Sequence, residues 1–347
     1  MSRSERKEWA KEALRGVENV TMPSFTADFA DLDEAGIRWD VDKAVEHGFC
    51  STMCAVETGL STDEAKRFLE IVADQAAGRI HVSFTLLNDS FEQSVELLEH
   101  AERVGCSHAL LGYPATFRPS GPDDVYEATA SLAEASNLGL VMYATDKFDF
   151  VRFHPSHIPF EAYDRIADLP TVVGMKVGFA DPAVTFESLR RYGDRVLVNV
   201  GTPWLMGLFP LLWREYGAQW FGGGSWEFWQ SPEKPNVVEY HGLVTEGRYE
   251  EAMKLYFSLA PATGMAMREG IGRGGDIGMY HWPMGKYISW SVGGNGGLTR
   301  EPAMRLTPMQ MDMRKNALRA IGIEPRQPDE EFFVGRVNFG REPAGVV

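Results

Sequence analysis

The sequence predicts an α/β fold, a closed parallel (β/α)8 TIM barrel followed by a C-terminal helical cap. Eight short apolar runs alternate with amphipathic segments, and the unit recurs about every 25 to 35 residues. Parallel strands need a crossover connection between them, so this order indicates a parallel sheet. No G-x-G-x-x-G pattern follows the first strand, which argues against an open dinucleotide-binding sheet.

The predicted strands are short and rich in branched aliphatic and aromatic residues, as expected for strands buried on both faces. Eight of them fit a closed barrel better than an open doubly wound sheet. In chain order they are residues 20–23, 50–53, 80–85, 108–112, 139–143, 172–176, 196–200 and 219–222.

The predicted helices carry the signals of helix ends. One opens at Thr62 with an N-cap hydroxyl and early acidic residues, and Gly105 ends another. Four begin at a proline, which suits the first helical position. After the helix at Thr62, the predicted helices are residues 89–103, 123–137, 159–167, 182–192, 203–216, 237–246, 249–259 and 308–321.

We expect the 347 residues to divide into four segments that form one unit. An N-terminal helix or arm covers residues 1–17, and the barrel covers residues 18–230. A helical cap follows over residues 231–324, where the strand pattern gives way to helices alone. Residues 325–347 are expected to form an extended tail.

Composition excludes several classes of function. The chain has 34 basic and 49 acidic residues, a formal charge of −15, which disfavours nucleic-acid binding. No run of about 18 apolar residues predicts a membrane span. The N-terminus resembles no signal peptide, so we expect a cytoplasmic protein.

The cysteines and histidines do not predict a metal site or a cofactor. Three cysteines are an odd number in a large chain, and we interpret Cys50, Cys54 and Cys106 as buried thiols. His154 and His157 lack the cysteine or carboxylate partners of a metal centre. We therefore expect neither a metal nor a cofactor.

Lys176 is the strongest catalytic candidate, because it ends the sixth strand and barrel chemistry gathers at the C-terminal strand ends. We expect its amine to lie over a mostly apolar barrel, where desolvation favours the uncharged, nucleophilic form. Such an amine condenses with a ketone or aldehyde to an iminium, which assists cleavage of a neighbouring bond. The alternative is a strand-end lysine in a salt bridge.

Tyr143 ends the adjacent fifth strand. Its phenol is placed to relay protons to a carbinolamine or a substrate hydroxyl near Lys176. The alternative is a barrel-top aromatic ring whose hydroxyl is already hydrogen-bonded.

Together these positions resemble the dihydrodipicolinate synthase/N-acetylneuraminate lyase family of class I aldolase-type barrels, over roughly residues 14–325. Gly174-Met175-Lys176 is similar to the family's Gly-x-Lys strand, and Tyr143 precedes that lysine by 33 residues. The resemblance implies that Lys176 forms the Schiff base and that Tyr143 relays protons. It also implies a homotetramer that needs no cofactor and acts on a small 2-oxo acid.

Three loops depart from the family pattern. The hydroxyl-bearing loop after strand two is replaced by Met53-Cys54-Ala55-Val56-Glu57, which keeps only the acid. Backbone amides remain to bind a carboxylate there, so we expect Cys54, Ala55 and Glu57 to contact substrate. After strand four, Ala115-Thr116 replaces the family's usual tyrosine, although we expect Tyr113 to bind substrate. After strand five, Tyr143-Ala144-Thr145-Asp146 replaces the family's Tyr-Asn-x-Pro.

One branch of the family fits better than the rest. Tyr143-Ala144 followed by Phe148-Asp149-Phe150 is similar to hydratase-aldolases that cleave aryl-substituted unsaturated pyruvates in polycyclic aromatic degradation. Such flat substrates need aromatic walls, and core packing is the alternative role for each ring. The candidate wall residues are Trp220, Trp226, Phe228, Trp229, Tyr280, Trp282 and Trp290.

Within that set we expect Trp226 and Trp282 to line the pocket, because both occur in glycine- or proline-shaped loops. Gly224 and Ser225 at the end of strand eight complete the predicted substrate contacts, together with His281. The alternative for His281 is a structural role.

The leading functional interpretation is a Schiff-base lyase that hydrates and cleaves an aryl-substituted unsaturated 2-oxo acid to an aldehyde and pyruvate. A second is a dehydratase, decarboxylase or aldolase acting on a sugar-derived keto acid. The third is a barrel that has lost its chemistry and acts as a binding protein. Aromatic content and the loss of loop hydroxyls favour the first, since sugar acids want hydroxyl-rich pockets.

Overall fold

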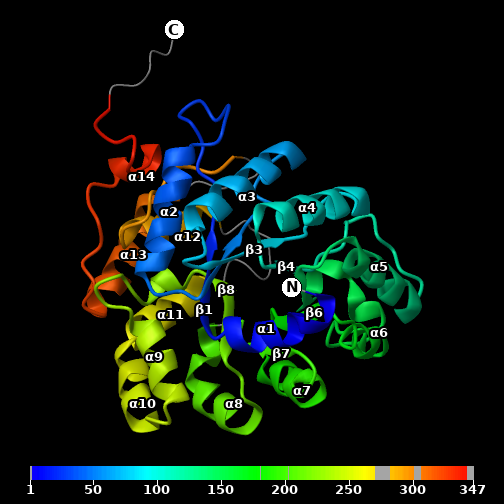
Figure 1. Cartoon of the computed structure of the whole chain (residues 1–347). Helices are drawn as coiled ribbons and strands as arrows, with labels where there is room; N and C mark the ends of the chain where they lie inside the picture. Colours follow the sequence, from blue (N-terminus) through cyan, green and yellow to red (C-terminus); the bar gives the residue numbers. More distant parts are fainter. Residues whose placement is uncertain (1, 180, 202, 270–281, 301–305, 342–347) are drawn as a thin grey trace.

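Eight parallel strands form the centre of the protein (Figure 1). The computed structural model describes residues 2–179, 181–201, 203–269, 282–300 and 306–341. The sheet order is β7-β6-β5-β4-β3-β2-β1-β8. The strands are β1 (Gly16–Thr21), β2 (Ser51–Cys54), β3 (His81–Thr85), β4 (His108–Leu110), β5 (Gly139–Ala144), β6 (Val172–Val177), β7 (Leu197–Asn199) and β8 (Trp220–Gly224).

The sheet closes on itself at the β7–β8 seam. The backbone N–H of Val200 donates to the carbonyl of Trp220 at 2.9 Å, while β8 pairs in parallel with β1 on its other side. The predicted (β/α)8 barrel is therefore confirmed, and all eight predicted strands are present.

Helices surround the barrel and extend beyond β8. Ser61 and Ser90 cap two of them through reciprocal bonds with Glu64 and Gln93, and Gly105 ends the second in the left-handed conformation. The α-helices are α1 (Arg6–Ala13), α2 (Glu34–Glu46), α3 (Thr62–Ala76), α4 (Phe91–Val104), α5 (Pro122–Ala135), α6 (Phe160–Ile166), α7 (Pro182–Tyr192), α8 (Phe209–Tyr216), α9 (Asn236–Thr245), α10 (Tyr249–Ser258), α11 (Ala260–Glu269), α12 (Trp282–Ser291), α13 (Pro308–Ala320) and α14 (Glu330–Val334).

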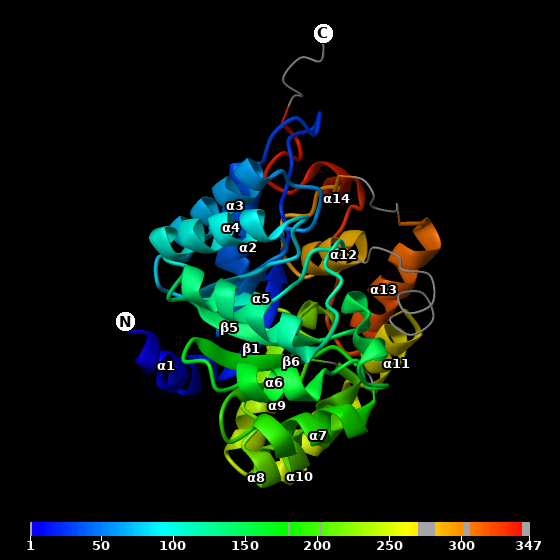
Figure 2. The same cartoon turned by 90° about the vertical axis from the view of Figure 1, so that its right-hand side faces the viewer.

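The two ends of the barrel are covered by different segments. Figure 2 shows α1 on one side of the barrel and α11, α12 and α13 on the other. Ala10 and Leu14, in and just after α1, belong to the same buried cluster as Val141 and Val173 inside the barrel. α1 therefore closes the N-terminal end, and the cap lies at the C-terminal end, where the strands finish.

Two elements depart from the sequence analysis at the N-terminal side. β1 begins at Gly16 instead of Val20, because Gly16 and Val17 pair with Trp220 and Phe221 of β8. Its polar residues interrupt the apolar run that marks a strand. The sequence analysis also lacks α2, whose buried positions are sparse but whose start is capped by Asp33.

The C-terminal tail is not wholly extended, which corrects the expectation for residues 325–347. Residues 330–334 form α14, and Phe332 is buried against Tyr287 and Trp290 of α12. Glu331 receives bonds from Arg326 and Arg336, which brace α14 from both sides. The described part of the tail therefore packs against the cap.

This packing predicts a large difference between two neighbouring phenylalanines. Phe332 is 1% exposed and Phe333 is 42% exposed. Phe332→Ala is expected to lower the free energy of unfolding by about 3 kcal/mol, because it leaves a cavity between aromatic rings. Phe333→Ala, the matched control, is expected to change it by less than about 1 kcal/mol. Urea unfolding curves measure both, and equal effects would contradict a docked tail.

Candidate active site

Lys176 and Tyr143 lie side by side on β6 and β5. They are register partners in the parallel ladder, and Nζ of Lys176 lies 5.4 Å from the centre of the Tyr143 ring. Both are partly exposed, whereas the residues on either side of them in the strands are buried. The predicted neighbours are therefore together at the C-terminal ends of their strands.

Neither residue makes the contacts expected if its role were purely structural. Nζ of Lys176 donates to the carbonyl of Gly223 at 3.0 Å and forms no salt bridge within the described residues. The Tyr143 hydroxyl has no hydrogen-bond partner among those residues, and only its backbone carbonyl is engaged, by the hydroxyl of Tyr163. Both reactive groups are thus available to a substrate.

The Gly223 carbonyl reaches Lys176 because β8 carries a β-bulge. Val17 pairs with Phe221 and Asn19 pairs with Gly224, so Glu18 of β1 faces two residues, Gly222 and Gly223. A Cβ on Gly223 would lie 2.9 Å from the Met53 side chain and 3.2 Å from the Glu18 carboxylate. The close approach explains a glycine at this point of β8.

A buried carboxylate, Glu18, lies in the barrel centre. Its Oε2 accepts bonds from Ser51 Oγ at 2.8 Å, Ser83 Oγ at 3.1 Å and His108 Nε2 at 2.9 Å. Its Oε1 accepts from the backbone N–H of Gly223 at 3.1 Å. Four donors and no competing acceptor hold this group as an anion.

The electrostatics of Glu18 correct the expectation of an apolar barrel beneath Lys176. Burial acts to raise the pKa of Glu18, but the hydrogen bond and charge of His108, the bond from Ser51 and the charge of Lys176 together hold that pKa below its usual value. A small cavity is lined by both Glu18 and Lys176. The lysine therefore stands over a negative charge.

The mouth of the barrel is largely apolar on the cap side. Trp282, at the start of α12, shares a buried cluster with Met22, Ala55 and Tyr143. A Cβ on Gly285 of the same helix would lie 3.1 Å from the hydroxyl of Ser225. Ser225 and the adjoining Gly224, at the end of β8, therefore lie next to α12; their contact with substrate stays a prediction.

The loop after β2 has already used two of its backbone amides. The N–H of Ala55 donates to the carbonyl of Thr21, and that of Val56 donates to the carbonyl of Cys54. Glu57 accepts a bond from Thr85, and burial raises its pKa above the usual value. The backbone amides of Ala55 and Val56 are thus already hydrogen-bonded within the protein and are not free to bind a carboxylate.

Three predicted substrate contacts lie elsewhere. Cys54 is fully buried in the cluster between barrel and helices, and burial raises the pKa of its thiol well above normal. Tyr113 is buried in the same cluster and its hydroxyl bonds to Thr129 of α5. Trp226 is fully buried, stacks on Phe221 and donates to a carbonyl of β8. Their side chains are buried in the packing between barrel and helices, which does not support side-chain contacts with substrate for these three residues.

The remaining aromatic candidates are mostly core residues. Trp229 donates to Thr263 of α11, Trp290 donates to Glu331 of α14, and Phe228 packs on Trp229. Trp220 faces the barrel interior, with its ring edge-on to that of His108. His281 and Tyr280 lie outside the described residues.

Sequence reasoning missed the polar cluster inside the barrel. Glu18 and Ser51 are register partners, as are Ser83 and His108, so four strands contribute to one layer. The available signal was a polar residue at an alternate position of an apolar strand. It also missed Lys147, an exposed cation whose Nζ lies 5.9 Å from the centre of the Tyr143 ring.

A second polar cluster occupies the outer face of β1. Asn19 donates to the buried Glu227 at 3.1 Å, and burial raises the pKa of Glu227 to about 7. Lys286 of α12 donates to Ser24 and to the carbonyl of Pro23, and burial lowers its pKa to about 8. These groups join the cap to the barrel behind the mouth.

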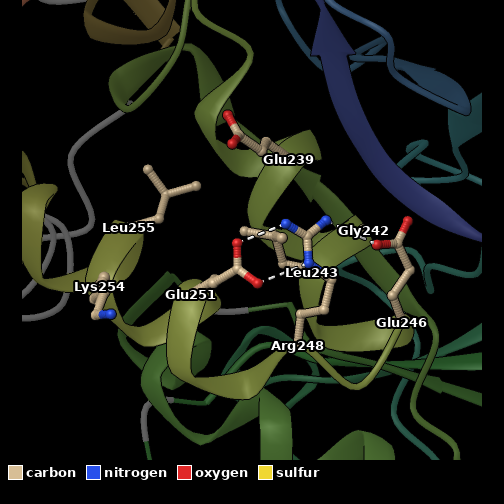
Figure 3. Close-up of a pocket in the computed structure, with 8 residues that line it drawn as sticks. All are labelled: Glu239, Gly242, Leu243, Glu246, Arg248, Glu251, Lys254 and Leu255. Atoms are coloured by element: carbon tan, nitrogen blue, oxygen red, sulfur yellow. Dashed lines mark hydrogen bonds and ion pairs between the residues drawn. The ribbon is translucent and has the colours of Figure 1, made fainter.

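A surface hollow between α9 and α10 is a poorer candidate site. Figure 3 shows Arg248 within it, bonded to Glu246 and Glu251. The guanidinium and its two carboxylates satisfy one another in solvent, and Lys254 pairs with Glu250. The hollow thus presents no unpaired functional group comparable with Lys176.

Two other features, a membrane-spanning helix and a metal-binding cluster, are absent from the described part of the chain. None of its helices has the length and apolar character that a membrane crossing requires. No group of three or more His, Cys, Asp or Glu side chains within it could hold a metal ion.

Comparison with known proteins places this geometry in a family. Residues 15–207, which include β1 to β7, match the Dihydrodipicolinate synthetase family. The chain belongs to this family. The matched segment contains Glu18, Tyr143 and Lys176, so the site described above lies within it.

The similar curated proteins are distant. A 4-hydroxy-tetrahydrodipicolinate synthase of Hyphomonas neptunium is 28% identical over 46% of this chain and 55% of its own length. A probable 5-dehydro-4-deoxyglucarate dehydratase of Bacillus licheniformis is 24% identical over 57% of this chain and 60% of the relative. The chain thus spans little more than half the length of such relatives.

Solved structures support the fold over a longer stretch. N-acetylneuraminate lyase from Fusobacterium nucleatum matches with a TM-score of 0.71 and 14% identity, over 89% of this chain and 99% of the other. PhdJ bound to a substrate intermediate matches with a TM-score of 0.70 and 19% identity, over 89% and 95%. At these identities the likeness concerns the barrel and its cap.

The raised pKa of Glu227 predicts a pH-dependent effect on stability. The folded protein holds this proton more tightly than the unfolded chain, so its stabilising contribution is complete below the unfolded pKa near 4.5 and is lost as pH rises to about 7. Glu227→Gln removes the loss. Its stability relative to wild type is expected to improve by on the order of 2 to 3 kcal/mol between pH 4.5 and 7.

Urea unfolding at several pH values measures this difference. Glu233→Gln is the control, because Glu233 is exposed on the same stretch of chain and is solvated in both states. A pH-independent difference for Glu227→Gln would contradict the prediction.

Proposed function

We propose that the protein is a class I lyase that forms a Schiff base through Lys176, of the hydratase-aldolase type, acting on an aryl-substituted unsaturated 2-oxo acid. The observation that carries the proposal is the pairing of an available amine and an unpartnered phenol at the barrel mouth. Membership of the family supports it.

The reaction begins when Nζ of Lys176 attacks the substrate ketone. A C–N bond forms, the carbonyl oxygen takes up a proton, and the amine nitrogen loses one, which gives a carbinolamine. The carbinolamine C–O bond then breaks, and its oxygen leaves as water with a proton from Tyr143. The product is an iminium conjugated to the substrate double bond.

Hydration and cleavage follow on the iminium. Water adds across the double bond, with its hydroxyl on the carbon that bears the aryl group. Loss of the hydroxyl proton to Tyr143 or solvent then breaks the C–C bond and releases an aldehyde, while the electron pair passes to the iminium to give an enamine. Protonation of the enamine carbon and hydrolysis of the C–N bond release pyruvate and restore Lys176.

Lys147 is the proposed partner of the substrate carboxylate. It is exposed at the mouth, and no described residue forms an ion pair with it. Its Nζ and that of Lys176 both lie within 6 Å of the Tyr143 ring centre, at 5.9 and 5.4 Å. A 2-oxo acid has adjacent carbonyl and carboxylate groups, which suit one nucleophilic amine and one cation beside the same ring.

The apolar side of the mouth supports an aryl group as the rest of the substrate. Trp282, Met22 and Ala55 share one cluster there with Tyr143, and they offer few hydrogen bonds to a polyhydroxylated chain. A sugar-derived keto acid remains the competing substrate, because one similar relative is named as a dehydratase of such a compound. The predicted homotetramer and cytoplasmic location stay predictions of the sequence analysis.

Borohydride trapping tests the Schiff base. Wild-type protein incubated with pyruvate and reduced is expected to carry an adduct on the peptide that contains Lys176. Lys286, whose amine is buried and bonded to Ser24, is the internal control and is expected to remain unmodified. Lys176→Arg keeps the charge but forms no imine, and it is expected to lose cleavage activity about a thousandfold or more.

Absence of an adduct with pyruvate and with several other 2-oxo acids, together with unchanged activity of Lys176→Arg, would overturn the proposal. The loss of arylidene absorbance on incubation with a benzylidene pyruvate separates the two enzyme interpretations. Turnover of a sugar-derived keto acid alone would favour the alternative, and turnover of neither compound would favour a binding protein.

Replacing Lys147 tests carboxylate recognition. Lys147→Met is expected to raise KM for the benzylidene pyruvate about 10- to 100-fold with little change in kcat, because it removes an ionic contact worth about 1.5 to 3 kcal/mol. Lys147→Arg is expected to stay close to wild type, as it retains the charge. Steady-state kinetics measure both variants, and a KM within twofold of wild type for the methionine variant would exclude this contact.

A further inference from the structure

We infer that Glu18 is a positioning residue for Lys176 and supplies the negative charge that faces its iminium. The inference rests on the proposed Schiff-base function and extends it to a residue inside the barrel. Glu18 acts through Gly223, whose backbone contacts both side chains.

Gly223 connects the two groups in space. Its N–H donates to Oε1 of Glu18 at 3.1 Å, and its carbonyl accepts from Nζ of Lys176 at 3.0 Å. The bulge in β8 turns both backbone groups toward the barrel interior. In a regular strand they would form hydrogen bonds with the neighbouring strands instead. The carboxylate therefore fixes the carbonyl that orients the amine.

The carboxylate is itself held firmly. Ser51, Ser83 and His108 donate to one of its oxygens from three different strands, so the side chain has little freedom to turn away. All three donors are buried. A preorganised charge of this kind acts without the cost of reorienting solvent during the reaction.

Few other charges act on this pair. Glu18 faces the imidazole of His108 and the amine of Lys176, and the thiols of Cys50 and Cys54 respond to its charge. Lys176 is additionally within electrostatic reach of Glu57, beyond β2, and contacts the ring of Tyr143. The exposed Lys147 lies by the same ring and also acts on Glu57. Glu18 is the fully buried carboxylate of this set and is therefore the least screened by solvent.

The charge favours the step in which water leaves. The carbinolamine nitrogen is neutral, whereas the iminium formed when the C–O bond breaks and water departs is positive. A fixed anion near the nitrogen lowers the energy of the iminium relative to the carbinolamine. The same anion faces the amine of free Lys176, so the effect of removing it can be measured without substrate.

Glu18→Gln tests the charge without any substrate. We expect the rate of acetylation of Lys176 by trace acetic anhydride at one fixed pH, followed by peptide mass spectrometry, to rise at least about threefold, because the anion that faces the amine is gone. Glu227→Gln is the matched control, since Glu227 is a buried carboxylate bound on the opposite face of β1, and its acetylation rate is expected to match wild type. An unchanged rate in a folded Glu18→Gln protein would overturn the inference.

Glu18→Asp tests positioning and also serves if the glutamine variant does not fold. The charge is kept, so the acetylation rate of Lys176 is expected to stay near that of wild type. The shorter side chain loses its reach to Gly223, and the rate of pyruvate trapping by borohydride is expected to fall at least tenfold. A trapping rate equal to that of wild type would contradict the positioning role.

The two proposals fail separately. If wild-type protein traps no 2-oxo acid but Glu18→Gln changes the acetylation rate of Lys176, then the proposed function is wrong and the coupling of Glu18 to Lys176 stands. If trapping succeeds and neither Glu18 variant differs from wild type, then the Schiff base stands and the role of Glu18 is excluded.

Discussion

The ionised carboxylate of Glu18 is the constraint on which the rest of the site depends. A charge in the centre of a barrel is costly unless donors surround it, and this requirement accounts for hydroxyl and imidazole groups at positions that barrels usually fill with aliphatic side chains. It also accounts for the bulge in β8, which turns the Gly223 N–H inward. The same bulge presents the carbonyl of Gly223 to Lys176. The bulge therefore both stabilises the buried anion of Glu18 and sets the position of the Lys176 amine.

The two faces of β1 illustrate how the number of donors decides the state of a buried acid. Glu18, inside the barrel, receives four hydrogen bonds and a nearby cation, and its pKa lies below the usual value. Glu227 packs on the outer face, where the Asn19 amide donates to it, and its pKa rises to about 7. One strand thus separates a carboxylate that is held as an anion at the mouth from an acid that holds its proton more tightly than usual and helps join barrel to cap.

Sequence reasoning found the barrel because hydrophobic periodicity reports the burial of each element separately. It found Lys176 and Tyr143 because both stand at strand ends, a position that can be counted along the chain. It did not settle which way Cys54, Tyr113 and Trp226 point, because a strand end does not fix the parity of a side chain, which points either to the mouth or to the surrounding helices. The register of a strand decides to which side each of its residues points, and β8 changes register at its bulge. The interior cluster was missed for the same reason, since Ser51 and Ser83 become neighbours of Glu18 only when the strands are aligned.

The loop after β2 then determines where an anionic substrate group can bind. That loop lacks the family's hydroxyls, and its amides at Ala55 and Val56 are engaged within the backbone. In the proposed function, recognition of the carboxylate moves to the β5 side of the mouth, where Lys147 is exposed beside Tyr143. A substrate bound there by its carboxylate, with its carbonyl at Lys176, would direct its remaining carbons toward the apolar cluster that contains Trp282. Such a site would favour a 2-oxo acid with a flat aryl group over a sugar acid, whose hydroxyls would lose water contacts there without replacement.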